Sequence, residues 1–193
     1  MAAADLRRIA RFSFDLNPPI VLTMINRYFT ATKWPFLAAA ASFLILCGAW
    51  FFQYVLGYEP CALCYDQRHY HWAVIGIGLV TGGLMAFRPG LRKYAPFACF
   101  ILLGAFLYSA GFAGWHAGIE YDWWAGPASC TTAGSVDVSM DELNAMLGGT
   151  GAPIVLCDEA AWRLFGISMA GYNALLSAGL AVISVLAAWR SDA

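Results

Sequence analysis

Charged residues are scarce in this chain of 193 residues, because Asp, Glu, Lys and Arg together make up only 12% of it. A soluble domain carries about twice that share, so there are too few charges here to cover a water-facing surface. The aromatic share of 16% excludes an intrinsically disordered chain. The net charge of −1 provides no basic field for binding nucleic acid. These shortages, together with a hydrophobic share of 61%, indicate an integral membrane protein.

Four long runs contain no Asp, Glu, Lys or Arg at all, and they cover about residues 34–56, 70–87, 94–115 and 167–189. About 20 apolar residues in a helix cross the hydrocarbon core of a bilayer, so each run predicts a transmembrane helix. Buried helices of a soluble bundle are the alternative, but such helices usually keep a polar face. We expect an all-α membrane protein, a four-transmembrane-helix bundle with two outer loops at about 57–69 and 116–166.

The few charges are distributed unevenly along the chain. If the spans alternate in direction, all but two of the 11 Lys and Arg residues fall on one side of the membrane. Because basic loops stay in the cytoplasm, both termini are expected there. Residues 34–193 form the expected transmembrane domain. The basic segment 1–33 is expected to lie on the inner membrane surface, with a poorly ordered tail as the alternative.

The second outer loop contains a helix signal of its own. Ser139 and Glu142 fit a capping box, and apolar residues at helical spacing continue up to Gly148 and Gly149. We therefore expect a short amphipathic surface helix on the outer side.

Six cysteines are present, and four of them fall in the expected outer loops: Cys61, Cys64, Cys130 and Cys157. Disulfides persist in an oxidising outer compartment, so these four are the candidates for redox chemistry. Cys47 and Cys99 fall inside spans, where we expect both to be small buried apolar side chains.

Cys61 and Cys64 form a Cys-X-X-Cys motif at the start of the second span. A helix N-terminus favours the thiolate form of cysteine, and so would Arg68, one turn after Cys64. The motif therefore predicts a redox-active pair. A structural disulfide is one alternative. A zinc site that adds His69 and His71 is another, although these two histidines would point to different helix faces.

Cys130 and Cys157 lie on either side of the expected surface helix. Paired, they would brace a large loop, or the loop could carry its disulfide to a soluble partner and exchange it with the first pair. The spans contain no acids or bases of the kind that mark an ion path, so a lipid-soluble electron acceptor fits better than transport. His116, near the outer end of the third span, could hydrogen-bond a quinone carbonyl beside Arg68, and interfacial packing is its alternative role.

The sequence resembles the DsbB family, the quinone-linked disulfide bond formation proteins of bacterial inner membranes. The resemblance covers about residues 36–189. It rests on Glu59-Pro-Cys-Ala-Leu-Cys-Tyr-Asp-Gln-Arg68, on the second cysteine pair with His116 before it, and on Cys157-Asp-Glu-Ala-Ala-Trp-Arg-Leu-Phe-Gly166. It implies a multi-pass protein with periplasmic cysteine loops, and ubiquinone or menaquinone near Cys64 and Arg68.

The family also implies a path for electrons. A reduced DsbA-like thioredoxin-fold protein attacks the Cys130–Cys157 disulfide, and Cys130 takes the mixed disulfide. The released Cys157 attacks Cys61, which leaves Cys64 as a thiolate against the quinone.

In this scheme Arg68 polarises the quinone, and His116 is a weaker candidate for contacting it. Gln67 stands where some members carry an acid, so no role is expected for it, and no metal is expected. Two other functions stay open from the residues themselves. One is a non-enzymatic membrane protein with structural disulfides, and the other is a redox protein like vitamin K epoxide reductase.

Overall fold

The computed structural model describes residues 29–128, 140, 144 and 155–190. Most of the basic segment 1–33 and the whole environment of Cys130 lie outside these residues. The expected surface helix also lies outside them, apart from Met140 and Asn144, which are both helical.

Four helical segments of the described chain are long and apolar enough to cross a membrane. The first joins α3 (Trp34–Trp50) to a π-helical turn η1 (Phe51–Val55), the second is α4 (Ala62–Phe87), the third joins a 3-10 segment η2 (Pro89–Tyr94) to α5 (Ala95–Glu120), and the fourth is α7 (Met169–Trp189). The expected four-helix membrane fold is confirmed.

Two helices are longer than the apolar runs that predicted them. Helix α4 begins at Ala62 instead of residue 70, and α5 continues to Glu120 instead of residue 115. Charged side chains keep a segment out of the hydrocarbon core but do not stop a helix, so hydropathy marks where lipid ends and not where the helix ends. The expected outer loops are shortened accordingly, and the second half of the Cys-X-X-Cys motif lies on a helix.

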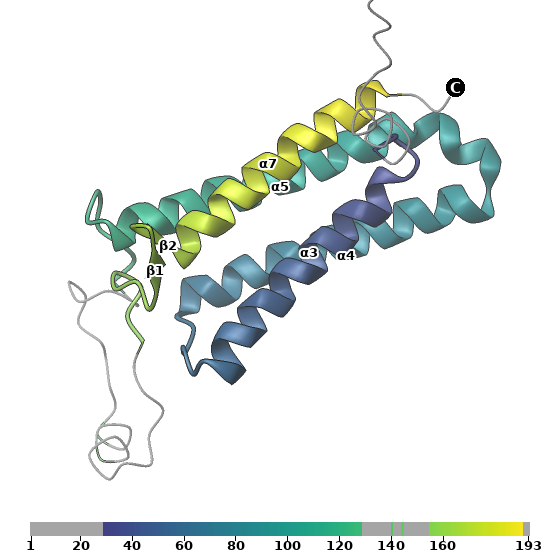
Figure 1. Cartoon of the computed structure of the whole chain (residues 1–193). Coiled ribbons are helices and arrows are strands. Elements are labelled where there is room, and N and C mark those ends of the chain that lie inside the picture. Colours follow the sequence, from purple (N-terminus) through teal and green to yellow (C-terminus); the bar gives the residue numbers. More distant parts are fainter. Residues whose placement is uncertain (1–28, 129–139, 141–143, 145–154, 191–193) are drawn as a thin grey trace, which may run out of the picture.

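The helices form two closely packed pairs, α3 with α4 and α5 with α7, as Figure 1 shows. Helices α3 and α4 approach closely at Gly78, where a Cβ atom would meet the backbone carbonyl oxygen of Pro35. Small residues allow such close backbone approach between membrane helices. At one end of the bundle, the backbone N–H of Ala31 donates to the carbonyl of Arg190 at 3.2 Å. The described chain therefore begins and ends on the same side, as four spans require.

The opposite end of the bundle carries a small antiparallel hairpin of β1 (Arg163–Leu164) and β2 (Ile167–Ser168). Its two turn residues, Phe165 and Gly166, both have positive φ angles, of 51° and 79°. A two-residue turn of this kind matches the twist of the paired strands. The Ser168 hydroxyl then accepts from the backbone N–H of Gly171 and caps α7.

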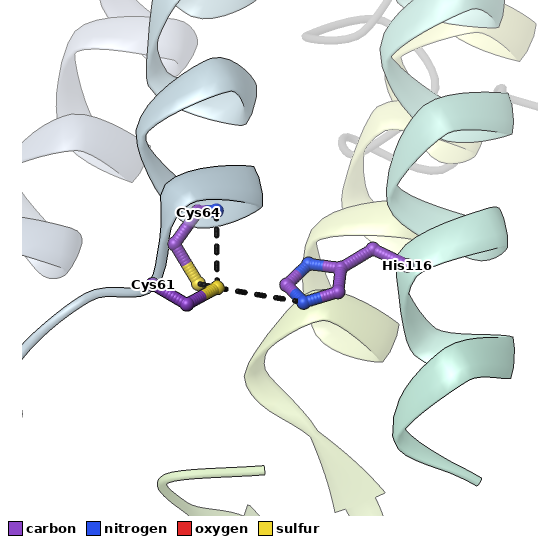
Figure 2. A group of neighbouring side chains, drawn as sticks. All are labelled: Cys61, Cys64 and His116. Carbon is purple, nitrogen blue, oxygen red and sulfur yellow. Dashed lines mark hydrogen bonds between the residues drawn. The ribbon is translucent and has the colours of Figure 1, made fainter. Parts of the chain in front are cut away.

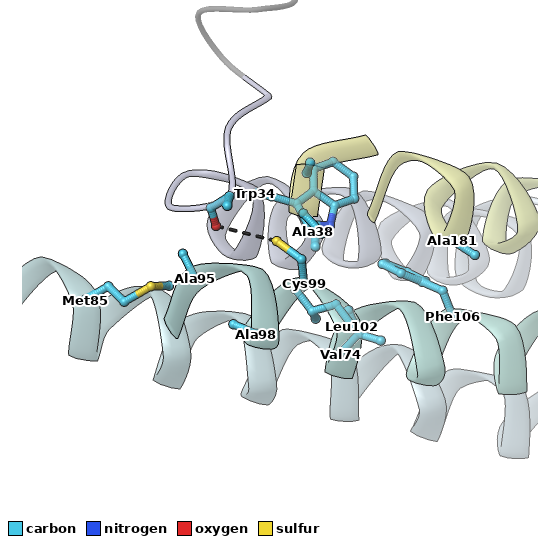
Figure 3. Packing of buried hydrophobic residues seen from close by; sticks show 13 residues of the cluster. Trp34, Ala38, Val74, Met85, Ala95, Ala98, Cys99, Leu102, Phe106 and Ala181 are labelled. Carbon is cyan, nitrogen blue, oxygen red and sulfur yellow. Dashed lines mark hydrogen bonds between the residues drawn. The ribbon is translucent and has the colours of Figure 1, made fainter. Parts of the chain in front are cut away.

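The apolar core fills the half of the bundle near the ends of the described chain (Figure 3). Trp34 is 1% exposed, and its indole N–H donates to the hydroxyl of Ser184 at 2.9 Å. Cys99 is fully buried, as expected. Cys47 is only partly buried, which differs from the expectation. A membrane helix also meets lipid, which accepts a small apolar side chain as well as a core does.

Candidate active site

The Cys-X-X-Cys pair lies at the hairpin end of the bundle, where the chain turns into α4. Cys61 is the N-cap residue of this helix, and its sulfur accepts from the backbone N–H of Cys64 at 3.4 Å. The two side chains are free thiols whose Sγ atoms are 3.1 Å apart, and Figure 2 shows the two sulfurs side by side. Cys61 is only 5% exposed and Cys64 is partly buried, so the sulfur of Cys61 is shielded from bulk water.

His116 lies directly against this pair. It is fully buried on α5, and its Nε2 atom is 3.6 Å from the Sγ of Cys61 (Figure 2). The sequence placed His116 near a span end, either beside a quinone and Arg68 or packed at the membrane interface. Because α5 continues one more turn, to Glu120, the imidazole instead lies inside the helix bundle and faces a sulfur.

The surroundings of Cys61 stabilise its thiolate. The hydrogen bond from Cys64 is the largest cause, and together with the hydrogen bond from His116 it lowers the pKa of Cys61 to about 5. Burial of the sulfur opposes this effect without cancelling it. A thiolate is the nucleophilic form of cysteine, so Cys61 is suited to thiol–disulfide exchange at neutral pH.

Cys157 packs into the same cluster. It is fully buried and disulfide-bonded, and it shares an apolar cluster with Cys61, Leu63 and Ile119. Its backbone also lies within hydrogen-bonding range of His116. The structure thus brings together three of the four cysteines in the outer segments. The fourth, Cys130, is outside the described residues, and its pairing with Cys157 stays a prediction.

A buried chain of hydrogen bonds leads away from His116. Gln67 Nε2 donates to His116 Nδ1 at 2.6 Å, and Asn173 Nδ2 donates to Gln67 Oε1 at 2.7 Å. Asn173 Oδ1 is 2.8 Å from Nε2 of His71, whose Nδ1 is 3.4 Å from the hydroxyl of Ser42. The chain therefore connects all four spans. In this arrangement the Nδ1 of His116 accepts a hydrogen bond, so its Nε2 carries the hydrogen that faces Cys61.

Sequence reasoning missed this network. It gave no role to Gln67 and did not consider Asn173, although both are amides in largely apolar helices. Polar side chains are costly in a membrane interior unless they are paired. An amide in an apolar run therefore predicts a polar partner on another helix, and this feature of the sequence could have revealed the network. Gln67 has a positioning role, because its side-chain amide fixes the orientation of the His116 ring.

The contacts of Arg68 are with the end of the first span and with a ring on its own helix. Its guanidinium donates to Gln53 Oε1 at 2.6 Å and lies 5.1 Å from the centre of the Tyr65 ring. Gln53 belongs to η1 and is 8% exposed. The wider turn of a π-helix is found frequently at functional sites, and here it contains the residue that binds the arginine.

A cavity of about 480 Å³ adjoins the cysteines. Its polar lining is formed by the acids Glu59, Glu120 and Glu159, together with Tyr58, Cys61, Cys64, Gln67, Arg68, His71, Tyr172 and Asn173. Most of the remaining wall is apolar, with Leu44, Ile45, Phe52, Trp162, Met169 and Leu176 among its residues. Ligand sites are typically apolar cavities of this size with a few convergent polar groups. The arrangement suits a small apolar molecule with hydrogen-bond acceptors.

The described residues do not assemble the four-ligand zinc alternative. His69 is exposed, and His71 is engaged with Ser42 and Asn173. The donor atoms that do come within 4.8 Å of one another belong to Cys61, Cys64 and His116. Structural zinc takes four protein ligands, and these three groups are already paired with one another.

Comparison with known proteins agrees with these features. The family model described as "Disulfide bond formation protein DsbB" matches residues 31–187. Proteins named "Disulfide bond formation protein B" are similar over most of the chain. The one from Marinobacter nauticus is 32% identical over 76% of this chain and 84% of its own length. The one from Methylococcus capsulatus is 30% identical over 81% and 92%, and the one from Idiomarina loihiensis is 33% identical over 74% and 76%.

No solved structure matches the chain significantly. The family match covers the four spans and the residues from Cys61 to Cys157 that form the cluster described above. The relatives' names agree with a membrane protein that acts on disulfides. The chain therefore belongs to the DsbB family of disulfide bond formation proteins, as a multi-pass membrane member with a disulfide-forming redox role.

Proposed function

We propose that this protein is a membrane thiol:quinone oxidoreductase that reoxidises a periplasmic DsbA-like thioredoxin-fold protein. One observation carries the proposal: Cys61, His116 and Cys157 are buried together, with the partly buried Cys64 against them, beside an apolar cavity. A purely structural disulfide needs neither a neighbouring imidazole nor a cavity. Both are expected where sulfur passes electrons to a small apolar acceptor.

The cavity fits a quinone head group in chemical character. Its polar groups include the guanidinium of Arg68, which can donate to a carbonyl oxygen, and the sulfur of Cys64. Apolar side chains from α3 and α7 surround them. Arg68 and Cys64 would hold the head group, and Gln53 would orient Arg68. Ubiquinone or menaquinone bound there supplies an acceptor for two electrons and two protons.

The proposed exchange begins at the distal cysteines. A thiolate of the soluble partner attacks the Cys130–Cys157 disulfide and forms a mixed disulfide with Cys130, which releases Cys157 as a thiolate. Cys157 attacks Cys61 of the oxidised proximal pair, and Cys64 leaves as a thiolate. The packing of Cys157 against Cys61 supports this step.

Resolution of the two intermediate bonds completes the cycle. The second cysteine of the partner attacks the mixed disulfide, leaves oxidised and frees Cys130. Cys130 re-forms its bond with Cys157 and returns Cys61 as a thiolate, which the neighbouring His116 stabilises. The pair Cys61 and Cys64 then gives up two electrons and closes as a disulfide, so each turnover oxidises one dithiol of the partner.

The experiment is reduction of decylubiquinone by the purified full-length protein with a reduced thioredoxin-fold partner. We expect Cys61→Ser, Cys64→Ser and Cys130→Ser each to lower turnover by roughly a thousandfold, because each variant removes a sulfur that forms or breaks a covalent bond. Cys47→Ser and Cys99→Ser are the matched controls and should keep normal turnover. Turnover that survives Cys64→Ser would contradict the mechanism, and stoichiometric zinc in the sample would favour a metal site.

A further inference from the structure

Glu120 is a buried acid that the scheme above does not use. It is the last residue of α5 and is 6% exposed, and its Oε2 atom has no hydrogen-bond partner within the described part of the chain. A buried carboxyl group without full pairing costs free energy. The negative end of a helix also opposes a permanent negative charge there.

The neighbours of Glu120 are the groups that react in the proposed scheme. Glu120 Oε1 is 3.9 Å from Nε2 of His116, the same nitrogen that contacts Cys61. The imidazole nitrogen therefore lies between a thiol and a carboxyl group, and Glu120 lines the cavity together with Cys61 and Cys64. A small torsional movement or one bridging water would span 3.9 Å.

The other polar groups that face Glu120 come from the hairpin segment. The hydroxyl of Ser168 lies within hydrogen-bonding range of the carboxyl group. The guanidinium of Arg163 donates to the backbone carbonyl of Glu120 at 2.6 Å. The charges of Arg163 and of Cys61, at the start of α4, also act on the carboxyl group. Oε2 has no hydrogen-bond partner among the described residues, so it is the carboxyl oxygen that can exchange a proton with a molecule in the cavity.

We propose that Glu120 is the proton relay of this site, an inference that rests on the proposed thiol:quinone activity. The exchange leaves Cys61 and Cys64 as thiolates, so their closure to a disulfide releases two electrons and no proton. Reduction of a quinone to a hydroquinone takes up two electrons and two protons, and the two protons are those that the dithiol of the soluble partner gave up to the outer aqueous side. Glu120 takes up one of these protons, delivers it to the reduced acceptor in the cavity, and is protonated again for the second transfer.

The test compares Glu120→Gln with Asp122→Asn in the purified full-length protein. Glutamine keeps the size and hydrogen bonding of Glu120 but cannot carry the proton. Asp122 is an exposed acid two residues further along, and its φ of 59° is one that asparagine tolerates. Decylubiquinone reduction by the prereduced protein is expected to fall at least tenfold in E120Q and to recover partly when a small weak acid such as formic acid is added. D122N should behave as wild type.

Two measurements do not require quinone. The equilibrium of the Cys61–Cys64 pair with dithiothreitol should stay within about twofold in E120Q, which would show an intact thiol site. The infrared difference spectrum between reduced and oxidised protein should contain a carboxyl band in wild type and D122N that E120Q lacks.

Unchanged quinone reduction in E120Q, or a carboxyl band that persists in it, would overturn the relay. A rate loss matched by an equal loss of dithiothreitol reactivity, without rescue by the weak acid, would also overturn it, because Glu120 would then act only on the structure. Failure of the wild-type protein to reduce decylubiquinone would be a different result and would count against the proposed function itself.

Discussion

Three groups act directly on the thiol of Cys61. The neighbouring Cys64 and His116 contact its sulfur at 3.1 Å and 3.6 Å, and the start of α4 presents the backbone N–H of Cys64 to it. Each of these contacts favours the thiolate, and burial opposes it. Reactivity at this residue is therefore a property of its packed surroundings, since an isolated cysteine is largely protonated at neutral pH.

The pH dependence of Cys61 alkylation follows from the contacts that stabilise its thiolate. Its pKa is lowered to about 5, so the thiolate is present above pH 5 and is lost as the pH falls through that value. Site-resolved alkylation of the reduced protein by iodoacetamide should be nearly constant from pH 8 to about pH 6 and decline near pH 5.

Variants of the two neighbouring side chains separate the causes of that pKa. Cys64→Ala should move the midpoint of the alkylation profile to higher pH, because the largest stabilising contact is lost. Cys64→Ser keeps a donor and should move it less. His116→Leu should raise the midpoint as well. A midpoint near 8 in the wild-type protein would show that these contacts do not stabilise the thiolate.

At the scale of secondary structure, the ends of the first and second spans are shaped to hold side chains together. The π-helical turn η1 contains Gln53, which accepts from Arg68 and donates to the hydroxyl of Tyr65 at 3.3 Å. Both partners of Gln53 lie on the first turns of α4, which sequence hydropathy assigned to a loop. The early start of α4 therefore gives Arg68 a defined position on the cavity wall.

Replacement of Gln53 should disturb quinone use more than thiol exchange. In Gln53→Leu the guanidinium of Arg68 loses its acceptor, and we expect the KM for decylubiquinone to rise about three- to tenfold, because losing the hydrogen bond that orients Arg68 weakens its contact with the quinone by about 1 kcal/mol. Exchange with the soluble partner should be unaffected. Gln53→Glu keeps an acceptor and is the control. Equal quinone kinetics in wild type and Gln53→Leu would remove Gln53 from the proposed site.

For the molecule as a whole, polar and apolar halves are separated along the bundle. The apolar core with Trp34 and Phe106 lies toward the end that carries Ala31 and Arg190. The cysteine cluster, the amide network and the cavity lie toward the hairpin end. The network that links His116, Gln67 and Asn173 joins three helices that the sequence places far apart. Such pairing both satisfies buried polar groups and fixes how the helices are rotated.

The proposed activity requires the hairpin end to face the periplasm. Single reporter cysteines at Glu59 and at Gly90, on opposite ends of the bundle, test this in intact cells. A membrane-impermeant maleimide should label E59C and leave G90C unlabelled until the cells are opened. Labelling of G90C alone would reverse the orientation, and Cys61 and Cys64 would then face the cytosol, away from any periplasmic partner.

Much of this protein could be predicted from the sequence because the relevant signals are local. Runs of about 20 apolar residues predict spans, and the Cys-X-X-Cys motif with its following residues indicates redox chemistry and the family. Helix ends were less well predicted, as at Ala62 and Glu120, because hydropathy reports contact with lipid and not backbone hydrogen bonding.

Only the tertiary structure decided which groups meet. His116 contacts Cys61, Gln67 holds His116, Gln53 holds Arg68, and Glu120 is buried behind the same imidazole. Most of these contacts join different helices, so they depend on how each helix is rotated and packed against its neighbours. Sequence spacing describes one helix at a time, whereas the chemistry of this site arises where several helices converge.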